Sequence, residues 1–253
     1  MNKFLSFIIC LLMIPTWCAA DNHEKPPTLI ADGWTMVPKE GHGAEFEAAL
    51  KAHLKMRMEK GDPRHWDTYV PVTGDKLNNY VVRSCCFEWA DQDKYAKWSN
   101  EHMGEHFNET VHPHVQKYMH NFTEIDTRNS NWGENTKANF VGVTHFEVKS
   151  GKGSDMSASI KSMSTLAKDN GWPRNWSWSY PVGGDGGVTL ATPYANYADM
   201  APMEESFYDF VVKHKKSKKK AEKMFDQFNG AIKSTHYTIY RHRVDLSMHE
   251  DED

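Results

Sequence analysis

The sequence predicts an α+β protein in which two ferredoxin-like βαββαβ repeats form one barrel within a single chain. Two observations predict this fold. The segment PRHWDTYVPVTGD at 63–75 returns as PRNWSWSYPVGGD at 173–185, so that Pro63 corresponds to Pro173. Around both segments, stretches typical of strands and of amphipathic helices follow in the same order. A long period with only two copies indicates a duplicated domain rather than a solenoid.

The same offset also holds in the stretch before the repeated segment. Glycines and apolar residues match there, in the pairs Gly43 and Gly153, Phe46 and Met156, Leu50 and Ile160, and Gly61 and Gly171. We therefore divide the chain into a first repeat at 21–128, a polar linker at 129–139 and a second repeat at 140–247. A signal peptide at 1–20 precedes them, and an acidic tail at 248–253 follows, in which HEDED at 249–253 is expected to be disordered.

Each repeat is expected to begin with a strand, at 33–37 and 140–148, and to continue into an amphipathic helix. A glycine-bearing turn separates the strand from the helix in both copies. The apolar residues of the helices recur at spacings of three and four, which puts them on one face. They are Phe46, Leu50 and Leu54 in the first copy, and Met156, Ile160 and Met163 in the second.

The second part of each repeat is richer in strands. A strand broken by proline is expected at 68–72 and 177–182, and a β-rich run at 80–90 and 188–198. A second helix then begins around Lys94 or Met203, and a last strand closes each repeat. One such repeat leaves one face of its sheet uncovered. The second copy can cover that face, which predicts a barrel made of two sheets.

The N-terminal segment 1–20 resembles an export signal. Lys3 is followed by an apolar run at 4–14 and by the small residues Cys18, Ala19 and Ala20. The apolar run is too short to span a bilayer. We expect cleavage after Ala20 and export to the periplasm or the medium, with a retained anchor as the alternative. No membrane span is expected in the rest of the chain.

The charge balance argues against a nucleic-acid partner, because the whole chain carries a formal net charge of −4. Of the four cysteines, Cys10 and Cys18 fall in the signal peptide, which leaves Cys85 and Cys86. Neighbouring residues of a strand point to opposite faces. We therefore expect two separate thiols, one of them buried, with a disulfide between the neighbours as the alternative. The sequence leaves further oligomerisation open.

The stretch FEWADQDKYAKWSNEHMGEHF at 87–107 resembles the strand-to-helix signature of the antibiotic-biosynthesis-monooxygenase-like family, the dimeric α+β barrels. The matching residues are Glu88, Trp89, Asp91, Tyr95 and Trp98, with His102 or His106 downstream. The resemblance implies this fold as a tandem duplication. It implies either a cofactor-independent oxygenase acting on aromatic compounds or, in another branch, a haem-degrading enzyme. In that branch a haem-ligand histidine would be expected where this chain has Asn108.

A histidine cluster gives the metal hypothesis. His102 and His106 are four residues apart, which puts them on one helix face at a spacing able to hold a metal. His112, His114 and His120 follow within the same stretch. No cofactor is predicted outright, and haem or a transition metal bound at His102 and His106 is one hypothesis. A solvated, histidine-rich surface is the other.

Aromatic residues of the repeated segment give the ligand-binding hypothesis. Those on equivalent strands could line a slot for a flat apolar ligand, or could simply be core. The candidates are Trp66, Tyr69, Trp176 and Trp178. Each copy also keeps an arginine, Arg64 or Arg174. These are expected either to pair with Asp75 or Asp185 of the same repeat or to face an anionic ligand.

The catalytic candidates lie where the two copies differ. His53 stands where the second copy has Met163, so it is either a buried structural histidine or a general base. Trp98 and His106 have no counterpart in the second copy either. The sequence thus predicts an exported protein that binds a small, flat, largely apolar molecule. An oxygenase using His53, Trp98 and His106, and a haem- or metal-binding protein, are the alternatives.

Overall fold

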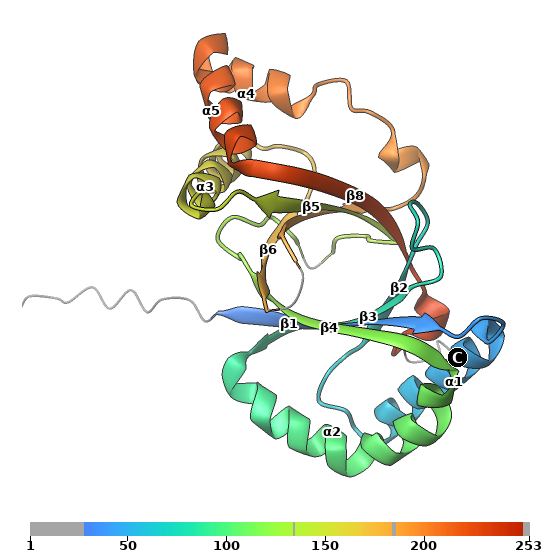
Figure 1. Cartoon of the computed structure of the whole chain (residues 1–253). Coiled ribbons are helices and arrows are strands. Elements are labelled where there is room, and N and C mark those ends of the chain that lie inside the picture. The colour runs from blue at the N-terminus through green and yellow to red at the C-terminus, as the bar shows by residue number, and fades with distance from the viewer. Residues whose placement is uncertain (1–27, 134, 184–185, 250–253) are drawn as a thin grey trace, which may run out of the picture.

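The structure is a computed structural model that describes residues 28–133, 135–183 and 186–249 (Figure 1). The predicted signal peptide at 1–20 lies outside the described residues, as does the end of the predicted acidic tail, at 250–253.

The first half has the predicted βαββαβ order. Its elements are β1 (Leu29–Pro38), α1 (Gly43–Glu59), β2 (Asp67–Pro71), β3 (Tyr80–Glu88), α2 (Gln92–His106) and β4 (Val115–Ile125). A π-helical turn at Phe107–Val111 and a short 3-10 turn at His112–His114 connect α2 to β4.

The second half repeats this order with one helix divided. Its elements are β5 (Phe140–Val148), α3 (Gly153–Asp169), β6 (Ser177–Val182), β7 (Val188–Tyr194), α4 (Phe207–Lys215), α5 (Lys218–Ala231) and β8 (Ile232–His242). The 129–139 connection between the halves follows β6 in part, since the backbones of Asn131 and Trp176 exchange hydrogen bonds of 2.8 and 3.2 Å.

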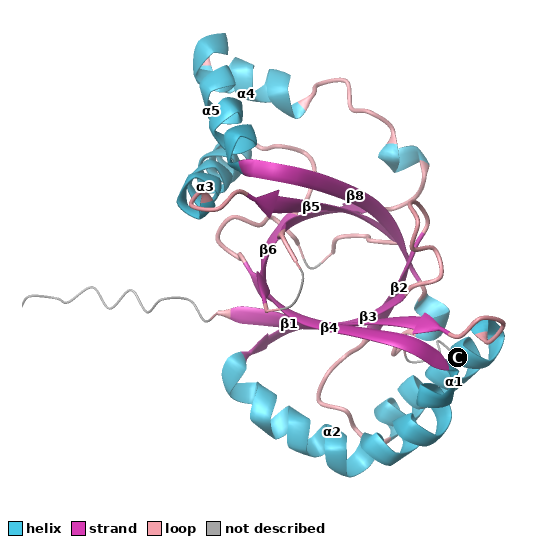
Figure 2. Ribbon diagram, viewed as in Figure 1, coloured by secondary structure: helices cyan, strands magenta, loops and turns pink. Residues whose placement is uncertain are grey.

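The eight strands form one closed barrel in the order β1-β3-β2-β8-β5-β7-β6-β4, in which every pairing is antiparallel. The two halves join at β2–β8 and at β4–β6. Helices α1 and α2 cover the outer face of one sheet, and α3, α4 and α5 lie outside the other (Figures 1 and 2). This confirms the predicted fold, in which each sheet closes the other and no strand edge is left open.

The cores lie between each sheet and its own helices. In the first half Phe46, Leu50 and Leu54 pack against Met36 and Val82 of the sheet. In the second half Met156 and Ile160 occupy the equivalent helix face. Burying one such side chain contributes about 1.5–3 kcal/mol. The apolar spacing of three and four therefore marks the faces that hold each helix on its sheet.

The second helix of the second half differs from the prediction. We expected one helix from about Met203, with the lysine-rich run at 213–223 as its solvated part. The chain instead breaks at Lys216, whose φ of 51° is left-handed. The Ser206 hydroxyl then caps α4, and the Ser217 hydroxyl caps α5 by accepting from the Lys220 N–H at 3.4 Å. The two serine caps therefore define two separate helices, where the lysine-rich run had suggested one continuous helix.

The chain after β8 crosses back to the first half. Met248, the first residue of the predicted acidic tail, is 5% exposed and belongs to the first core. Its N–H donates to the Trp66 carbonyl at 2.9 Å, and Arg243 pairs with Glu47 of α1 at 2.7 Å. The packed part of the chain therefore extends through Met248, up to the acidic end of the sequence.

Cys85 and Cys86 are joined to each other by a disulfide, across a cis peptide bond. Both are exposed, at the point of β3 where the β1–β3 register shifts. The expectation of two separate thiols, one buried, is wrong. A bulge interrupts the alternation of faces on which that expectation relied.

Candidate functional site

A cavity of about 390 Å³ lies in the first half, between its sheet and the helices α1 and α2. Most of its lining is apolar or aromatic. The side chains from the sheet are Asp32, Trp34, Met36, Val82 and His120, those from the helical layer include Leu50, His53, Leu54, Arg57, Tyr95, Met103 and Phe107, and Trp66 lies just before β2. The volume falls within the range of small-molecule pockets, which is about 300–1,000 Å³.

The local structure explains why these residues meet. Asp32, Trp34 and Met36 are alternate residues of β1, so they share the face that looks toward the helices. His53 and Arg57 are four residues apart on the buried face of α1. The cavity therefore collects polar groups that the strand and the helix bring to an otherwise apolar layer.

The two halves differ at these positions. At the offset that relates the two copies, the second half has Gly142 for Asp32, Met163 for His53, Ala167 for Arg57 and Trp172 for Asp62. Met163 is buried, Ala167 belongs to the core of the second half, and Trp172 packs against it. The polar constellation therefore belongs to the first half alone, as expected for a site rather than a shared scaffold.

Trp66 presents an unused donor at the cavity. Its side chain is 5% exposed, and its Nε1 is buried with no hydrogen-bond partner among the described residues. The equivalent Trp176 donates its Nε1–H to the Asn129 carbonyl at 2.6 Å. Buried donors are satisfied in the great majority of cases. Trp66 therefore carries an unsatisfied donor on a side chain that lines the cavity.

Asp32 and His120 form a polar pair on the sheet side of the cavity. The His120 Nε2 lies 2.9 Å from Asp32 Oδ1, and the His120 ring stacks on Trp34 with centroids 4.1 Å apart. Arg64 approaches the other carboxylate oxygen at 3.3 Å. Because a carboxylate only accepts, the Nε2–H of His120 donates to Asp32, and Nδ1 is the ring nitrogen outside this bond. The pair therefore fixes the orientation of the His120 ring.

His53 and His106, two of the catalytic candidates, are brought together by α1 and α2. Their Nδ1 atoms are 3.0 Å apart, and Arg57 donates to His53 Nε2 at 3.3 Å. Burial, helped by the Arg57 and His106 charges, lowers the pKa of His53 to about 3. His53 is therefore neutral at pH 7, with its basic nitrogen covered by Arg57. His53 is therefore poorly suited to act as a base, and its contact with His106 links α1 to α2.

We expect the stability of the protein to fall as the pH drops below about 6.5. An unfolded histidine takes up a proton near pH 6.5, whereas folded His53 resists it down to its pKa of about 3. The unfolded state binds more protons in this interval, so the free energy of unfolding decreases with falling pH. His53→Met, the residue of the second half, should flatten this slope in urea denaturation at pH 7 and pH 4. An unchanged slope would contradict the assignment.

Arg57 is the centre of the polar network under α1. It forms a buried ion pair with Asp62 at 2.5 Å and also donates to the Tyr95 hydroxyl and, at 3.3 Å, to Ser99. Burial raises the pKa of Tyr95 to about 12, which keeps the phenol protonated. Trp98 lies 5.7 Å from the guanidinium in a cation–π contact. The guanidinium therefore holds the helical wall of the cavity together.

The two histidines of the metal hypothesis have different partners. His102 is exposed, stacks on Trp98 with centroids 5.1 Å apart, and places its Nδ1 2.8 Å from the Trp98 carbonyl. His106 is bonded to His53 instead. Trp98 packs against the first core beside the cavity and is not one of the residues that line it. A metal shared by His102 and His106 stays a prediction.

The repeated arginines have structural partners that the sequence did not suggest. Arg64 pairs with Asp32 and donates to Gln92 at 2.7 Å, so the expected pairing with Asp75 is wrong. Arg174 pairs with Asp199 at 3.1 Å, and Asp185 lies outside the described residues. Each arginine thus reaches a carboxylate from another part of its repeat, because the sheet places distant segments closer than the neighbouring turn.

The aromatic candidates are divided between three places. Trp66 lines the first-half cavity, whereas Tyr69 stacks on His242 at 5.0 Å. Trp176 and Trp178 are buried in the core of the second half. The structure therefore does not bring the aromatic candidates into one slot.

Sequence reasoning missed several residues of the cavity, among them Asp32, Arg57 and His120. Asp32 lies one residue before the strand predicted at 33–37, and His120 was noted only as part of the histidine cluster. The sequence signal that could have identified Asp32 is its alternation with Trp34 and Met36. This spacing puts a carboxylate on the same strand face as two apolar residues. The pairing of Asp32 with His120 could not be seen in the sequence, because it depends on how β1 and β4 align. In that alignment Asp32 lies opposite Phe122, two residues from His120.

Comparisons with known proteins show the fold. No protein-family model matches the chain, and no curated protein matches it in sequence. A Lactobacillus acidophilus protein provisionally described as a monooxygenase matches with a TM-score of 0.54 and 15% identity over 85% of this chain and 94% of its own. A similarly described protein from Fusobacterium nucleatum gives 0.53 and 13%, over 86% and 94%.

A mutant chlorite dismutase from Candidatus Nitrospira defluvii also matches, with a TM-score of 0.51 and 8% identity over 86% of this chain and 92% of its own. The chain therefore has the ferredoxin-like α+β barrel fold that these monooxygenase-like and chlorite dismutase structures share.

No helix among the described residues is long and apolar enough to cross a membrane.

Proposed function

We propose that the first-half cavity binds a small, flat, largely apolar molecule that carries a hydrogen-bond acceptor. The observation that carries the proposal is the unpaired Nε1 of Trp66, a side chain that lines this cavity. Aromatic and aliphatic side chains suit a flat apolar body, and the indole N–H suits a single oxygen of the ligand. We also propose, from the signal-like segment 1–20, that the protein is exported.

A second function is favoured by the Asp32–His120 pair. A bound phenol or other weak acid whose proton reaches His120 Nδ1 would be deprotonated there, and Asp32 would stabilise the resulting imidazolium. The electron-rich anion so formed is the species that reacts with oxygen in a cofactor-independent oxygenase. The fold similarity to proteins provisionally described as monooxygenases and the resemblance of 87–107 to that family support this function.

Haem fits the cavity only in part. A histidine whose second nitrogen is bonded to a carboxylate, as in His120–Asp32, is an arrangement that holds haem iron. The two propionates would need cations, however, and Arg57 and Arg64 are already paired with Asp62 and Asp32. The cavity of about 390 Å³ is also near the lower end of the small-molecule range. We therefore assign no haem to this cavity.

We expect 1-naphthol to bind more tightly than naphthalene, and the preference to be lost in Trp66→Phe. One hydrogen bond contributes about 0.5–1.5 kcal/mol, or roughly 2- to 13-fold in affinity. Trp176→Phe is the matched control, because its indole N–H already has a partner. Calorimetric titration of the three proteins with both compounds measures the effect. Equal affinities for the two compounds in the wild type would overturn the proposed donor.

We expect oxygen uptake with aromatic quinols such as 1,4-dihydroxynaphthalene to exceed the uncatalysed rate, and to fall by about 10²–10⁴-fold in His120→Gln. Trp98→Phe should retain most activity, because Trp98 does not line the cavity. Uptake unaffected by His120→Gln would reject the base while leaving the binding proposal to the naphthol titration. A Soret band in protein from haem-replete cells, absent in His120→Ala, would favour haem instead.

A further inference from the structure

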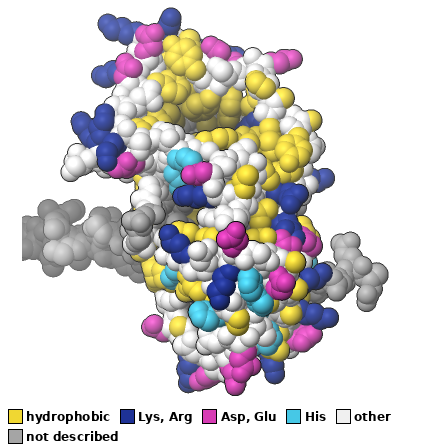
Figure 3. Space-filling model, turned by 45° about the vertical axis from the view of Figure 1, so that its right-hand side comes forward, with side chains coloured by type: hydrophobic (Ala, Val, Ile, Leu, Met, Phe, Trp, Pro, Cys, Tyr) yellow, Lys and Arg dark blue, Asp and Glu magenta, His cyan; other side chains and the backbone are white. Residues whose placement is uncertain are grey.

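A second group of chemically capable side chains lies where the chain end meets β2. His65 and Asp67 stand two residues apart at the start of β2, and His249 follows the short turn after β8. His249 is far from the other two in the sequence, and none of the three side chains lines the cavity under α1 and α2. Several histidines lie on the surface of the half that carries α1 and α2 in the space-filling view (Figure 3).

The three side chains converge on a single point. One potential ligand atom from each of His65, Asp67 and His249 lies within 4.8 Å of the other two. The Asp67 Oδ1 is 3.3 Å from His65 Nε2 and 4.0 Å from His249 Nε2. Ligands on a tetrahedral metal with bonds of about 2.0–2.1 Å are about 3.4 Å apart. The two imidazoles are 52% and 40% exposed, so their rings have room to adjust toward that spacing.

His249 supplies an independent sign of a missing partner. Its Nε2 is buried and has no hydrogen-bond partner among the described residues. Buried polar atoms without a partner are rare in folded proteins. An imidazole nitrogen that has no hydrogen-bond partner is available to a metal ion.

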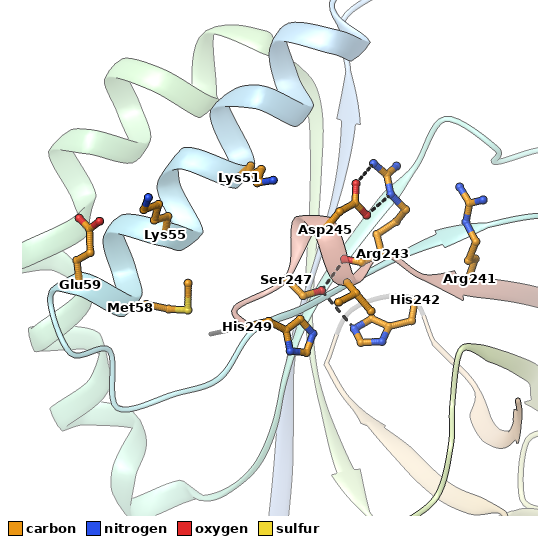
Figure 4. Close-up of a pocket in the computed structure, with 11 residues that line it drawn as sticks. Lys51, Lys55, Met58, Glu59, Arg241, His242, Arg243, Asp245, Ser247 and His249 are labelled. Carbon is orange, nitrogen blue, oxygen red and sulfur yellow. Dashed lines mark hydrogen bonds and ion pairs between the residues drawn. The ribbon is translucent and has the colours of Figure 1, made fainter. Parts of the chain in front are cut away.

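The Asp67 carboxylate is held in place by a third histidine. His242 Nε2 lies 2.9 Å from Asp67 Oδ1, and its ring stacks on Tyr69. Hydrogen bonds of this kind orient the ligands of metal sites. His242 and His249 also line an open cavity of about 1,300 Å³ between α1 and the C-terminal segment (Figure 4). This cavity and the exposed His65 ring therefore place the cluster close to solvent.

We propose that His65, Asp67 and His249 bind a divalent first-row transition metal such as Zn²⁺, with a coordination position left open. Two imidazoles and one carboxylate form a donor set typical of such metals, and three protein ligands on a tetrahedral ion leave one place for water or a small anion. The metal also joins the C-terminal segment to β2, since Met248 is already anchored in the first core.

Zinc binding to the full chain, measured by calorimetry at pH 7.5, tests the proposal. The wild type should bind one Zn²⁺ tightly, and His249→Gln and His65→Gln should each weaken that binding more than about 100-fold, beyond the 10- to 100-fold loss typical of groups that only support a ligand. His114→Gln is the control, because exposed His114 and His42 form another close pair, at 3.2 Å. Near-UV circular dichroism checks that each variant is folded.

Cobalt(II) gives a second measurement that does not depend on affinity. Bound Co²⁺ should show the intense visible bands of a low-coordinate site, and azide should shift them by entering the open position. Tight zinc binding that survives in both His249→Gln and His65→Gln, or that is lost in His114→Gln instead, would overturn the proposal. Cobalt bands indifferent to azide would overturn the open position.

Discussion

Replacing Arg57 with methionine is expected to destabilise the protein by about 3–5 kcal/mol, which makes it one of the two largest effects we predict. Arg57 and Asp62 form an ion pair 2.5 Å long whose side chains are 9% and 0% exposed. Removal of the guanidinium leaves a carboxylate buried without its cation. Urea denaturation at pH 7 measures the loss.

Two further variants separate charge from packing at this site. Adding Asp62→Asn to Arg57→Met removes the stranded charge, so the double variant should regain part of the lost stability. Lys152→Met breaks the ion pair with Asp155, which is 2.8 Å long but exposed, and should change stability little. If the double variant is as unstable as Arg57→Met alone, lost packing rather than the buried charge explains the effect.

Gly187→Ala is expected to destabilise the barrel by about 3 kcal/mol, the upper end of the overpacking range. A Cβ at Gly187 would overlap the carbonyl group of Phe146, whose carbon would be 2.7 Å away. The obstacle is the backbone of β5, which pairs with β7 directly beyond Gly187, from Val188 opposite Phe146. A strand backbone in a closed barrel cannot move away from the added methyl group as a flexible side chain could.

A matched glycine-to-alanine substitution elsewhere in the chain is expected to stabilise the protein instead. Gly230→Ala in α5 meets nothing within 4 Å, so it should stabilise the helix by about 0.5–1 kcal/mol. Thermal denaturation of both variants beside the wild type gives the comparison. A Gly187→Ala protein as stable as the wild type would show that β5 and β7 can separate locally without loss of the barrel.

The repeat and its elements could be read from the sequence because their causes are local or periodic. Phe46, Leu50 and Leu54 follow the helical period, and each packs in the core as that period requires. The boundary of α4 and α5 was missed, although Ser206 and Ser217 are ordinary capping residues. Their signal was outweighed by a lysine-rich run that is compatible with a helix.

The candidate site could be predicted only in outline. His53, Trp66 and His106 were singled out, but the Asp32–His120 pair joins residues from the first and last strands of the repeat. Nothing in the neighbourhood of either residue specifies the other. The same holds for His249, which meets Asp67 only because Met248 returns to the first core.

The sequence by itself determined that this protein is a duplicated βαββαβ unit, which faces of the helices are buried, and that the two halves differ at His53. These properties follow from the offset between the two copies, the periodicity of the apolar residues and the composition, all of which can be read from the linear sequence. The tertiary structure alone decided which polar groups meet: Asp32 with His120, Arg57 with Asp62, and His249 with Asp67. Such contacts depend on strand register and on the path of the chain end, and these are set by the packing of the whole barrel.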